Sequence, residues 1–470
     1  MLMSYAAAID RLFALVPELY TQPGQPRRKF SLDEVAVLLN ALGNPQRRFQ
    51  TVLIAGTNGK GSTAATLASI LCSSSQNKSG ENAHKSRGSS QVGLYTSPHL
   101  ERVNERIRVG SQQISEEDFA RHYFAVQNAA QQQMDSGHLA QMPSFFEMLT
   151  CLAFLHFAEA GVEIAVLEVG MGGRLDATNI VDPLLAIVTD ISLDHTEWLG
   201  ATIAEIACEK AGILRANGTL ITLPQHPEAN RVLGERAIEL NVRSVNAAAY
   251  MPPRTSNPDA AYTIQAMGER LLVDSPLQGL HQQRNIALAI AAAVELAEHT
   301  GFRITPQSIE RGVHETIWPG RMERFIDPHG RQWLLDVAHN PAGAWALRAA
   351  LGNPPAVGEQ LLIFSCLRDK PLAEMAQILF PLFDRLIVAP IHSMRANTMD
   401  QLLGAAQLTG TPAVGVQTIQ EAIDLASQSS ATRVVVSGSA YLVGEARPLI
   451  RALASGTVPI LSNIRQKSCI

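Results

Sequence analysis

The chain has 470 residues, more than one hydrophobic core usually organises, so we expect two domains. Its 43 acidic and 38 basic residues nearly balance, and no basic stripe alternates with aromatic residues, which argues against a nucleic-acid partner and favours a small substrate. The five cysteines form no paired motif, which favours reduced thiols over disulfides or a zinc site. No apolar run is long enough to cross a membrane, and charges interrupt the apolar pattern of residues 1–20, so we expect no signal peptide and a cytoplasmic location.

Short apolar runs alternate with helical stretches in both halves, which is typical of parallel sheets covered by helices and predicts an α/β fold. The expected strands are residues 51–55, 163–168, 185–190, 219–223, 332–336, 361–365, 385–389 and 433–437. The expected helices are residues 31–42, 63–72, 116–131, 145–160, 202–211, 281–299, 341–351, 371–380 and 418–428.

Two segments are expected to be irregular, and a third is expected to separate the domains. The serine-rich residues 73–90 predict a flexible surface insertion, and residues 251–260, rich in proline, asparagine and aspartate, predict a loop. Residues 317–320 follow a helical stretch and precede a new alternation of strands and helices. We therefore predict one domain over residues 1–318 and a smaller one over residues 319–470.

A candidate phosphate-binding loop follows the first expected strand. Residues 56–62, with the sequence GTNGKGS, lie between that strand and a helix. Glycines let backbone N–H groups turn inward, the helix start adds partial positive charge, and Lys60 can reach the outer phosphates of a nucleotide. The loop differs from the usual form, because Ile54 occupies the first glycine position and Gly61 separates Lys60 from Ser62. A glycine-rich turn is often only a turn, but the position between strand and helix favours phosphate binding.

Acidic residues follow two further strands. Glu168 ends a buried strand and precedes a glycine-rich loop that contains Asp176, and ligands of open α/β sheets bind at such strand ends. Glu168 is thus a candidate metal or nucleotide ligand, although it could instead cap a helix or pair with Arg174. The next strand leads to Asp194 and His195. A lone histidine there is more often structural, and Mg²⁺ prefers oxygen donors, which favours Asp194 or Glu168 over His195 as a ligand.

The helix expected over residues 202–211 has a register that can be derived from its ends. Thr202 and Glu205 form a capping box at its start, and Gly212 supplies its stop. This register places Lys210 on the apolar face. Burial lowers the pKa of a lysine and frees a nucleophilic amine, which can pair with a carboxylate, bind phosphate or capture CO₂ as a carbamate. The alternative is a lysine that extends past the helix end or pairs with an acid.

In the second half, a strand ends in Asp336, and Asn340 before a proline predicts the start of the next helix. Asp336 and His339 are therefore expected at the ligand edge of the second sheet. If the ligand edges of the two domains face each other, Asn285 and Arg321 would approach a nucleotide between them. Arg321 could then stabilise charge on a transferred phosphoryl group. Either residue could equally be a helix-end or interdomain contact.

Together these segments resemble the folylpolyglutamate synthase and dihydrofolate synthase family, which is related to the Mur ligases of cell-wall synthesis. The resemblance runs over nearly the whole chain, and the unusual phosphate loop is the form used in this family. Its motifs are GTNGKGS at 56–62, TSPHL at 96–100, SFFE at 144–147, residues 168–179, Asp194-His195, EKAG at 209–212 and residues 335–341. It implies a P-loop ATPase-like domain, a smaller Rossmann-like α/β domain, and ATP-dependent ligation of L-glutamate to a pterin-linked carboxylate through an acyl phosphate.

The resemblance also implies a role for each residue at a matching position. The implied ATP contacts are Thr57, Asn58, Gly59, Lys60, Gly61, Ser62, Asn285, Arg321, Asp336 and His339. Two Mg²⁺ ions are implied, with ligands Ser97, Glu168, His195 and Lys210, the last as N6-carboxylysine. The implied pterin or folate contacts are Ser97, Pro98, His99, Ser144, Phe145, Phe146, Glu147, Leu175, Asp176 and Ala177. The implied catalytic residues are Lys60, Lys210, His195 and Arg321, so for His195 the resemblance overrides the preference for oxygen donors.

Two alternatives stay open. A Mur ligase would share the loop and the lysine, but it places a domain of about a hundred residues before the loop, whereas 55 residues precede Gly56 here. A non-catalytic ATP-binding regulator would not need Glu168, Lys210 and Asp336 at three separate strand or helix ends. We favour a bifunctional enzyme that uses dihydropteroate, reduced folates and L-glutamate, and the resemblance implies a monomer.

Overall fold

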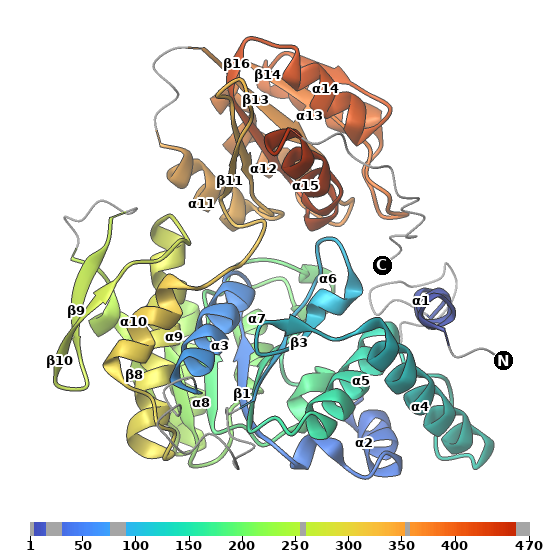
Figure 1. The fold of residues 1–470 in the computed structure, drawn as a ribbon, viewed down its shortest axis with the longest axis vertical. Helices are drawn as coiled ribbons and strands as arrows, with labels where there is room; N and C mark the ends of the chain where they lie inside the picture. Colours follow the sequence, from blue (N-terminus) through green and yellow to red (C-terminus); the bar gives the residue numbers. More distant parts are fainter. Residues whose placement is uncertain (1–3, 16–30, 76–90, 254–259, 353–357, 457–470) are drawn as a thin grey trace. The chain divides into compact units, whose positions relative to one another are not determined.

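The computed structural model describes residues 4–15, 31–75, 91–253, 260–352 and 358–456 (Figure 1). Most of the predicted insertion and of the loop predicted over 251–260 therefore lies outside the described residues. The chain divides into two compact units, each described by itself below. The first consists of Met1–Pro98, Asn104–Pro276 and Gln282–Ile317, and the second of His99–Val103, Leu277–His281 and Trp318–Ile470.

The first unit contains an eight-stranded sheet with the order β4-β3-β2-β5-β1-β6-β7-β8. Its strands are β1 (Gln50–Ala55), β2 (Val92–Tyr95), β3 (Ile107–Val109), β4 (Gln112–Gln113), β5 (Ile164–Glu168), β6 (Leu185–Val188), β7 (Thr219–Thr222) and β8 (Arg243–Asn246). From β2 to β8 all neighbours are parallel. The central strands β5, β1 and β6 are almost wholly buried, which explains their uninterrupted apolar sequences. A hairpin of β9 (Tyr262–Ala266) and β10 (Glu269–Val273) is separate from this sheet.

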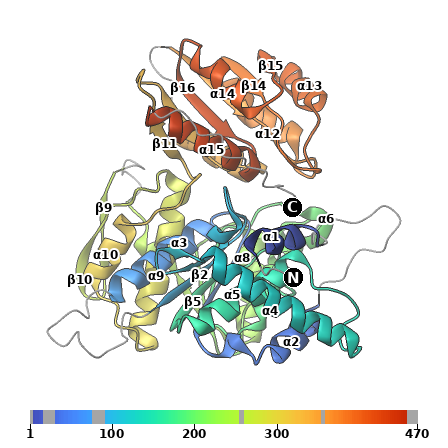
Figure 2. The same cartoon turned by 45° about the vertical axis from the view of Figure 1, so that its right-hand side comes forward.

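Helices cover both faces of the first sheet. They are α1 (Tyr5–Phe13), α2 (Leu32–Ala41), α3 (Lys60–Ser75), α4 (Glu116–Asp135), α5 (Phe145–Glu159), α6 (Thr196–Leu199), α7 (Ile203–Ala211), α8 (Pro227–Glu239), α9 (Leu280–His299) and α10 (Pro306–His314). The connections from β1 to β2 and from β2 to β5 run in opposite directions across the sheet, so right-handed crossovers place α3 and α5 on opposite faces. Helix α10 packs on α3, whereas α2, α4 and α5 lie side by side (Figure 2). No helix in the described ranges is both long and apolar enough to cross a membrane.

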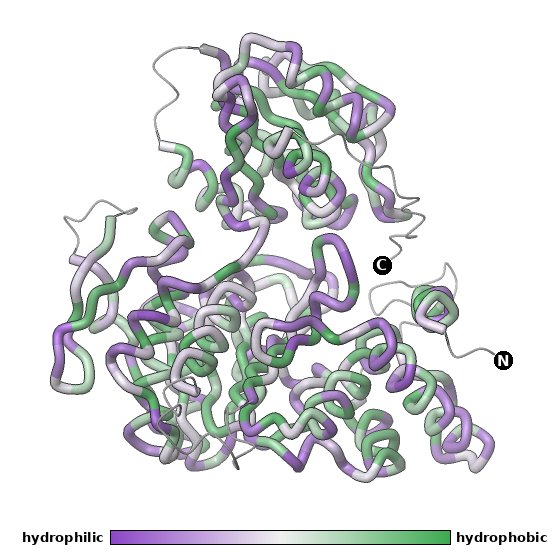
Figure 3. The backbone as a smooth tube through the Cα atoms, viewed as in Figure 1, coloured by the Kyte–Doolittle hydropathy of each residue, from purple (hydrophilic) through white to green (hydrophobic). Residues whose placement is uncertain are grey.

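The second unit contains a six-stranded sheet with the order β11-β12-β16-β13-β14-β15, in which only β11 is antiparallel. Its strands are β11 (Glu323–Ile326), β12 (Gln332–Leu335), β13 (Glu359–Phe364), β14 (Arg385–Val388), β15 (Ala413–Gly415) and β16 (Ala431–Ser437). Its helices are α11 (Pro341–Leu351), α12 (Leu372–Leu379), α13 (Met399–Thr409), α14 (Ile419–Ser427) and α15 (Ala440–Ala454). One apolar core joins the sheet to α11, α12 and α13, and the other joins it to α14 and α15. Figure 3 shows hydrophobic residues concentrated along the strands of each unit.

Both units are α/β, as predicted, and each expected strand corresponds to an observed one. Helix α3 begins at Lys60 rather than at residue 63, because the helix starts inside the phosphate loop. The elements that the sequence analysis did not assign include β2, α8, α13 and α15. Strand β2 has only four residues, and α15 contains Pro448, which normally disfavours a helix interior.

Candidate active site

The phosphate loop joins β1 to α3 and is tied to the segment that follows β6. The N–H groups of Thr57 and Asn58 donate to the carbonyl oxygen of Asp190 at 2.9 and 3.3 Å. The Thr57 hydroxyl donates to the carbonyl oxygen of Ser192 at 3.0 Å, and the Asn58 amide donates to the Ser192 hydroxyl at 3.2 Å. The end of the neighbouring strand therefore fixes the first half of the loop.

The second half of the loop fits a phosphate group. Gly59 has a φ of +89°, and a Cβ atom at this position would lie 2.1 Å from the Oδ1 atom of Asn285, so only glycine fits. The close approach also places Asn285 of α9 directly against the loop. At the start of α3, the N–H groups of Lys60, Gly61 and Ser62 have no partner within the helix, which makes this helix end a suitable site for an anion.

Two lysine side chains converge on one carbonyl group of the loop. Lys210 Nζ donates to the Gly56 oxygen at 2.7 Å, and Lys60 Nζ donates to the same oxygen at 3.1 Å and to the Thr57 oxygen at 3.2 Å. Lys210 is 3% exposed, which confirms the buried register predicted for its helix. Burial, reinforced by the charge of Lys60 and opposed by that of Asp194, lowers the pKa of Lys210 to about 7. A large fraction of its amine is therefore neutral at physiological pH.

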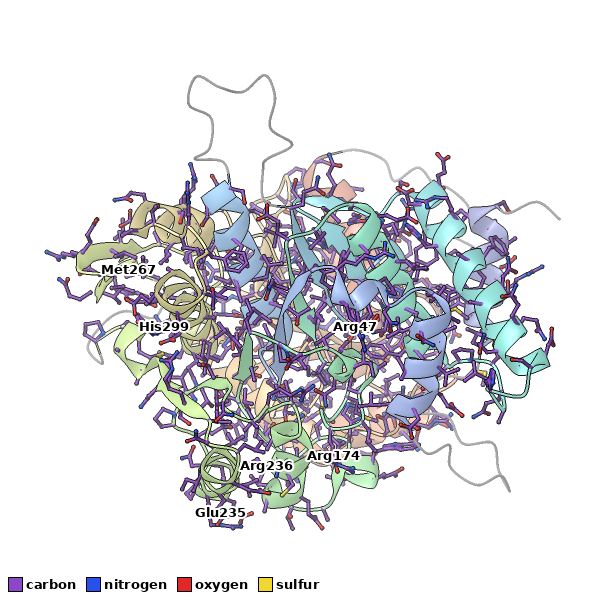
Figure 4. All side chains as sticks on the ribbon, turned by 90° about the horizontal axis from the view of Figure 1, so that it is seen from below. Arg47, Arg174, Glu235, Arg236, Met267 and His299 are labelled. Carbon is purple, nitrogen blue, oxygen red and sulfur yellow. The ribbon has the colours of Figure 1, made fainter. Side chains whose placement is uncertain are left out.

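The end of α7 is ordered as the sequence predicts. Thr202 and Glu205 form the capping box, and Gly212 is the C-cap residue. Arg174, labelled in Figure 4, forms an ion pair with Glu209 at 2.8 Å.

Glu168 and Ser97 come together at the ends of the neighbouring strands β5 and β2. The Ser97 N–H group donates to Glu168 Oε2 at 3.0 Å, and Glu168 is 4% exposed. A buried carboxylate suits Mg²⁺, which prefers hard oxygen donors. Among the described residues, no group of three or more His, Cys, Asp and Glu side chains is placed to hold a metal ion. A metal site here would therefore need donors of other types, such as Ser97.

His195 lies at the N-terminus of α6 with a φ of +50°. Its N–H group donates to Asp194 Oδ1 at 2.9 Å, and its Nε2 atom lies 3.9 Å from the same oxygen. The Asp194 side chain is 7% exposed, and its charge acts on Lys210. The sequence analysis proposed Asp194 as a possible metal ligand. In the structure its carboxylate binds the His195 N–H group, and its negative charge raises the pKa of Lys210.

A pocket in the first unit brings together several residues predicted to contact the pterin. It is lined by Glu147, Met171, Gly172, Gly173, Arg174, Leu175, Asp176, Ala177, Trp198, Leu199 and Glu209. Asp176 organises its floor, since its carboxylate accepts from the N–H groups of Met171 and Thr178 at 2.9 and 3.0 Å. Burial raises the pKa of Asp176, and these hydrogen bonds oppose that shift. Glu147 also forms a capping box with Ser144 at the start of α5.

The remaining predicted folate contacts lie outside the lining of this pocket. Phe145 and Phe146 are buried in the first turn of α5, and the Phe146 ring packs 5.8 Å from the Tyr95 ring. Ser97 and Pro98 follow β2, and His99 begins a short segment assigned to the second unit. The pocket thus unites Glu147 with residues 175–177, but not with every residue of the predicted set.

In the second unit, Asp336 organises two backbone turns. Its Oδ2 atom accepts from the Met322 N–H group at 3.0 Å, and its Oδ1 atom accepts from the Ala338 N–H group at 2.9 Å. The first bond fixes the turn that carries Arg321. His339 Nδ1 lies 2.9 Å from the Val337 carbonyl oxygen.

The helix start predicted next to this turn is confirmed. Asn340 is the N-cap of α11, Pro341 is its first residue, and the Asn340 side chain accepts from the Gly343 N–H group at 2.8 Å. His339 therefore immediately precedes the N-terminus of a helix.

Two ion pairs beside the site were missed by the sequence analysis. Arg284 binds both carboxylate oxygens of Asp190, at 2.8 Å through Nε and 2.6 Å through Nη2. Asp190 ends an expected strand, and Arg284 directly precedes Asn285, a predicted ATP contact. Both residues therefore lie next to positions that the sequence analysis had marked as functional. The second pair, Arg447 with Glu323, joins residues 124 positions apart and left no local signal.

Comparisons with known proteins identify the family. The Mur ligase middle domain matches residues 129–293, and the Mur ligase, glutamate ligase domain matches residues 320–440. The dihydrofolate synthase/folylpolyglutamate synthase of Mycobacterium tuberculosis is 32% identical over 460 residues, covering 89% of this chain and 90% of that relative. A structure of Escherichia coli FolC in complex with DHPP and ADP superposes with a TM-score of 0.78 at 29% identity, covering 96% of this chain and 98% of the other.

A third relative is longer than this chain. The Haloferax volcanii protein named "Probable bifunctional folylpolyglutamate synthase/dihydropteroate synthase" is 34% identical over 476 residues. The match covers 99% of this chain but spans only about half, 53%, of that relative. Across both domains and nearly its whole length, the chain therefore belongs to the folylpolyglutamate synthase and dihydrofolate synthase family of ATP-dependent ligases.

Proposed function

We propose that this protein adds L-glutamate both to dihydropteroate, which makes dihydrofolate, and to the γ-carboxylate of reduced folates. The observation that carries the proposal is the convergence of Lys60 and Lys210 on the phosphate loop. It is supported by the Ser97 and Glu168 pair at the adjacent strand ends and by the names of the relatives. A regulator that only senses ATP would not require a buried lysine and a buried carboxylate beside its loop.

In the proposed reaction, a carboxylate oxygen of the acceptor attacks the γ-phosphorus of ATP, and ADP leaves. The glutamate amine then attacks the acyl carbon, loses a proton, and displaces phosphate from the tetrahedral intermediate. The N–H groups at the start of α3 bind the phosphates together with Thr57, Asn58, Gly59 and Lys60, and Lys60 adds a full positive charge. Asn285, Asp336 and His339 are proposed as further ATP contacts, and Arg321 stabilises charge on the transferred phosphoryl group.

Acceptor binding is assigned to the lining of the pocket described above and its neighbours. Glu147, Leu175, Asp176 and Ala177 are the proposed pterin contacts within it. Ser97, Pro98, His99, Ser144, Phe145 and Phe146 complete the proposed folate-binding set. Phe146 supplies an aromatic surface suited to a flat heterocycle.

Metal binding is assigned to Ser97, Glu168, His195 and Lys210, the last as a carbamate. The Lys210 amine is buried and has a pKa of about 7, so its neutral form can add to CO₂ and, on losing a proton to solvent, become an anionic oxygen donor. Two Mg²⁺ ions, when bound, would neutralise charge on the phosphates. The donor set fits this role because three of its members supply oxygen atoms.

The decisive experiment is Mg²⁺-dependent release of ADP and phosphate by the purified protein. Dihydropteroate plus L-glutamate is compared with tetrahydrofolate plus L-glutamate, and each component is omitted in turn. Release with both acceptors is expected. Release with only one would restrict the activity to that acceptor. Release only with a muramyl nucleotide acceptor would favour a cell-wall ligase. A failure to release ADP and phosphate with any of these acceptors would contradict ligation. Sedimentation of the same sample tests the proposed monomer.

A further inference from the structure

Arg447, near the middle of α15, binds two carboxylates of the second unit. Its Nε and Nη2 atoms donate to the two oxygens of Glu323 at 2.8 Å each, and its Nη1 atom donates to Glu101. The side chains of Arg447, Glu323 and Glu101 are 16%, 20% and 23% exposed. Two-point pairing of a guanidinium with a carboxylate fixes geometry more strictly than a single contact, and partial burial limits screening by salt.

Glu101 lies on the continuation of the loop that carries Ser97. The Ser97 N–H group is bonded to Glu168, whereas Glu101 is held by Arg447 only four residues later. The segment lies directly on α15, because a Cβ atom at Gly444 would be 2.1 Å from the Leu100 carbonyl oxygen. Within the second unit, the segment His99–Val103 is thus held on α15.

Glu323 lies beside the turn that carries Arg321. Its Oε2 atom accepts from the Gly320 N–H group at 2.9 Å, and the Gly320 carbonyl oxygen accepts from the Val337 N–H group at 3.0 Å. On the other side of Arg321, the Met322 N–H group donates to Asp336, as described above. The backbone of this turn is therefore fixed by two carboxylates, one of which is bound by Arg447.

We infer that Arg447 is a positioning residue that holds two segments of the second unit. These are the segment His99–Val103, held through Glu101, and the turn carrying Arg321, held through Glu323. Arg447 acts on both segments through the two carboxylates. The inference deepens the proposed function, because the roles of His99 and Arg321 rest on that function.

Hydrogen exchange of the ligand-free protein tests the inference without depending on activity. Arg447→Met is expected to accelerate exchange in peptides covering both residues 96–104 and residues 318–324. Glu101→Gln should accelerate exchange only in the first peptide, and Glu323→Gln only in the second. Arg451→Met is the matched control, since Arg451 lies one turn further along α15, is 53% exposed and, among the described residues, pairs with Glu101 at 3.5 Å. It should leave both peptides unchanged.

Steady-state kinetics supply a second measurement. Arg447→Met should lower kcat/KM about tenfold or more, because small displacements of positioning groups carry large rate penalties. Glu101→Gln should act mainly on KM for the folate acceptor, and Glu323→Gln mainly on kcat. The variant with both glutamates replaced should have a kcat/KM close to that of Arg447→Met. It should not show the loss obtained by multiplying the two single effects.

The outcomes separate this inference from the proposed function. Unchanged exchange in both peptides of Arg447→Met, at a melting temperature equal to that of the wild type, would overturn the positioning role. Equal acceleration across the whole second unit would also overturn it, because that result would indicate general destabilisation. An inactive wild type would contradict the proposed function, while the exchange pattern would still decide whether Arg447 holds the two segments.

Discussion

The two units place positive groups at their strand ends by opposite means. In the first unit, Lys60 and Lys210 donate to backbone carbonyl groups of the phosphate loop, which leaves the N–H groups at the start of α3 directed at a ligand. In the second unit, the carboxylates of Asp336 and Glu323 accept from backbone N–H groups and fix the turn that carries Arg321. The first site therefore offers backbone dipoles and the charge of Lys60, and the second offers a guanidinium. The difference makes each unit sensitive to different substitutions.

The largest expected effect comes from removing the buried lysine of the first unit. Lys210→Ala should lower turnover by about 10²–10³-fold, the range found when one preorganised electrostatic group is lost. The fold should persist, because a buried amine with a lowered pKa contributes little to stability. Activity and circular dichroism of this variant are compared with those of Cys208→Ala, an exposed substitution on the same helix. Full activity in Lys210→Ala would contradict the catalytic role, and intact mass without an added carboxyl group in bicarbonate would contradict the carbamate.

Gly59→Ala tests whether the first site depends on backbone geometry. The new Cβ atom would meet Asn285 Oδ1 at 2.1 Å, and the alanine would have to adopt a φ of +89°. Either the loop or Asn285 must therefore move. We expect a loss of about 10²-fold in kcat/KM for ATP, because a displacement of about 1 Å can cost this much. Initial rates at varied ATP concentration measure the loss. A variant with wild-type KM and kcat would show that Asn285 adapts at no cost.

The pKa of Lys210 also predicts how stability depends on pH. The pKa falls from 10.5 to about 7 on folding, so the unfolded chain binds more protons than the folded chain between these values. Stability of the ligand-free protein should therefore rise as the pH increases from 7 to 9, by about 2 kcal/mol from this group. The loss of stability caused by burying the charged Lys210 amine is complete below pH 7 and absent above pH 10.5, the pKa of this lysine in the unfolded chain. Denaturant unfolding of wild type and Lys210→Met at several pH values measures the difference, and equal slopes would show that the lysine is not responsible.

Asp336→Asn tests the carboxylate of the second unit. Asparagine retains one oxygen, but its amide nitrogen would face a backbone N–H group that now donates to Asp336, either that of Met322 or that of Ala338. The turn carrying Arg321 should loosen and kcat should fall about tenfold or more.

Asp384→Asn is the control for this effect, because Asp384 accepts from the Gln360 N–H group at 2.8 Å beside a different part of the same sheet. It should lower stability without a comparable loss of kcat. Similar kinetic losses in both variants would show that the effect of Asp336 is not local to the Arg321 turn.

The sequence predicted local features of the site better than its long-range pairs. The capping box at Thr202 defined a helical register, and that register alone predicted the burial of Lys210. Asn340 likewise predicted the start of α11. The contact of Gly59 with Asn285 and the pairing of Arg447 with Glu101 join residues more than 200 positions apart. No periodicity or motif encodes such a contact, because it depends on how crossover helices pack across a finished sheet.

The smallest expected effect sharpens the contrast within the first unit, because it applies the substitution made at Gly59 to a glycine with no functional role. Gly234 lies inside α8, and a Cβ atom there would meet nothing within 4 Å. Gly234→Ala should therefore stabilise the protein by about 0.5–1 kcal/mol, because alanine loses less backbone entropy in a helix. Calorimetry should show a melting temperature raised by about 1 °C, with kcat and KM unchanged. A destabilised Gly234→Ala would mean that glycines of this unit are constrained generally, and the sensitivity of Gly59 could then not be attributed to its contact with Asn285.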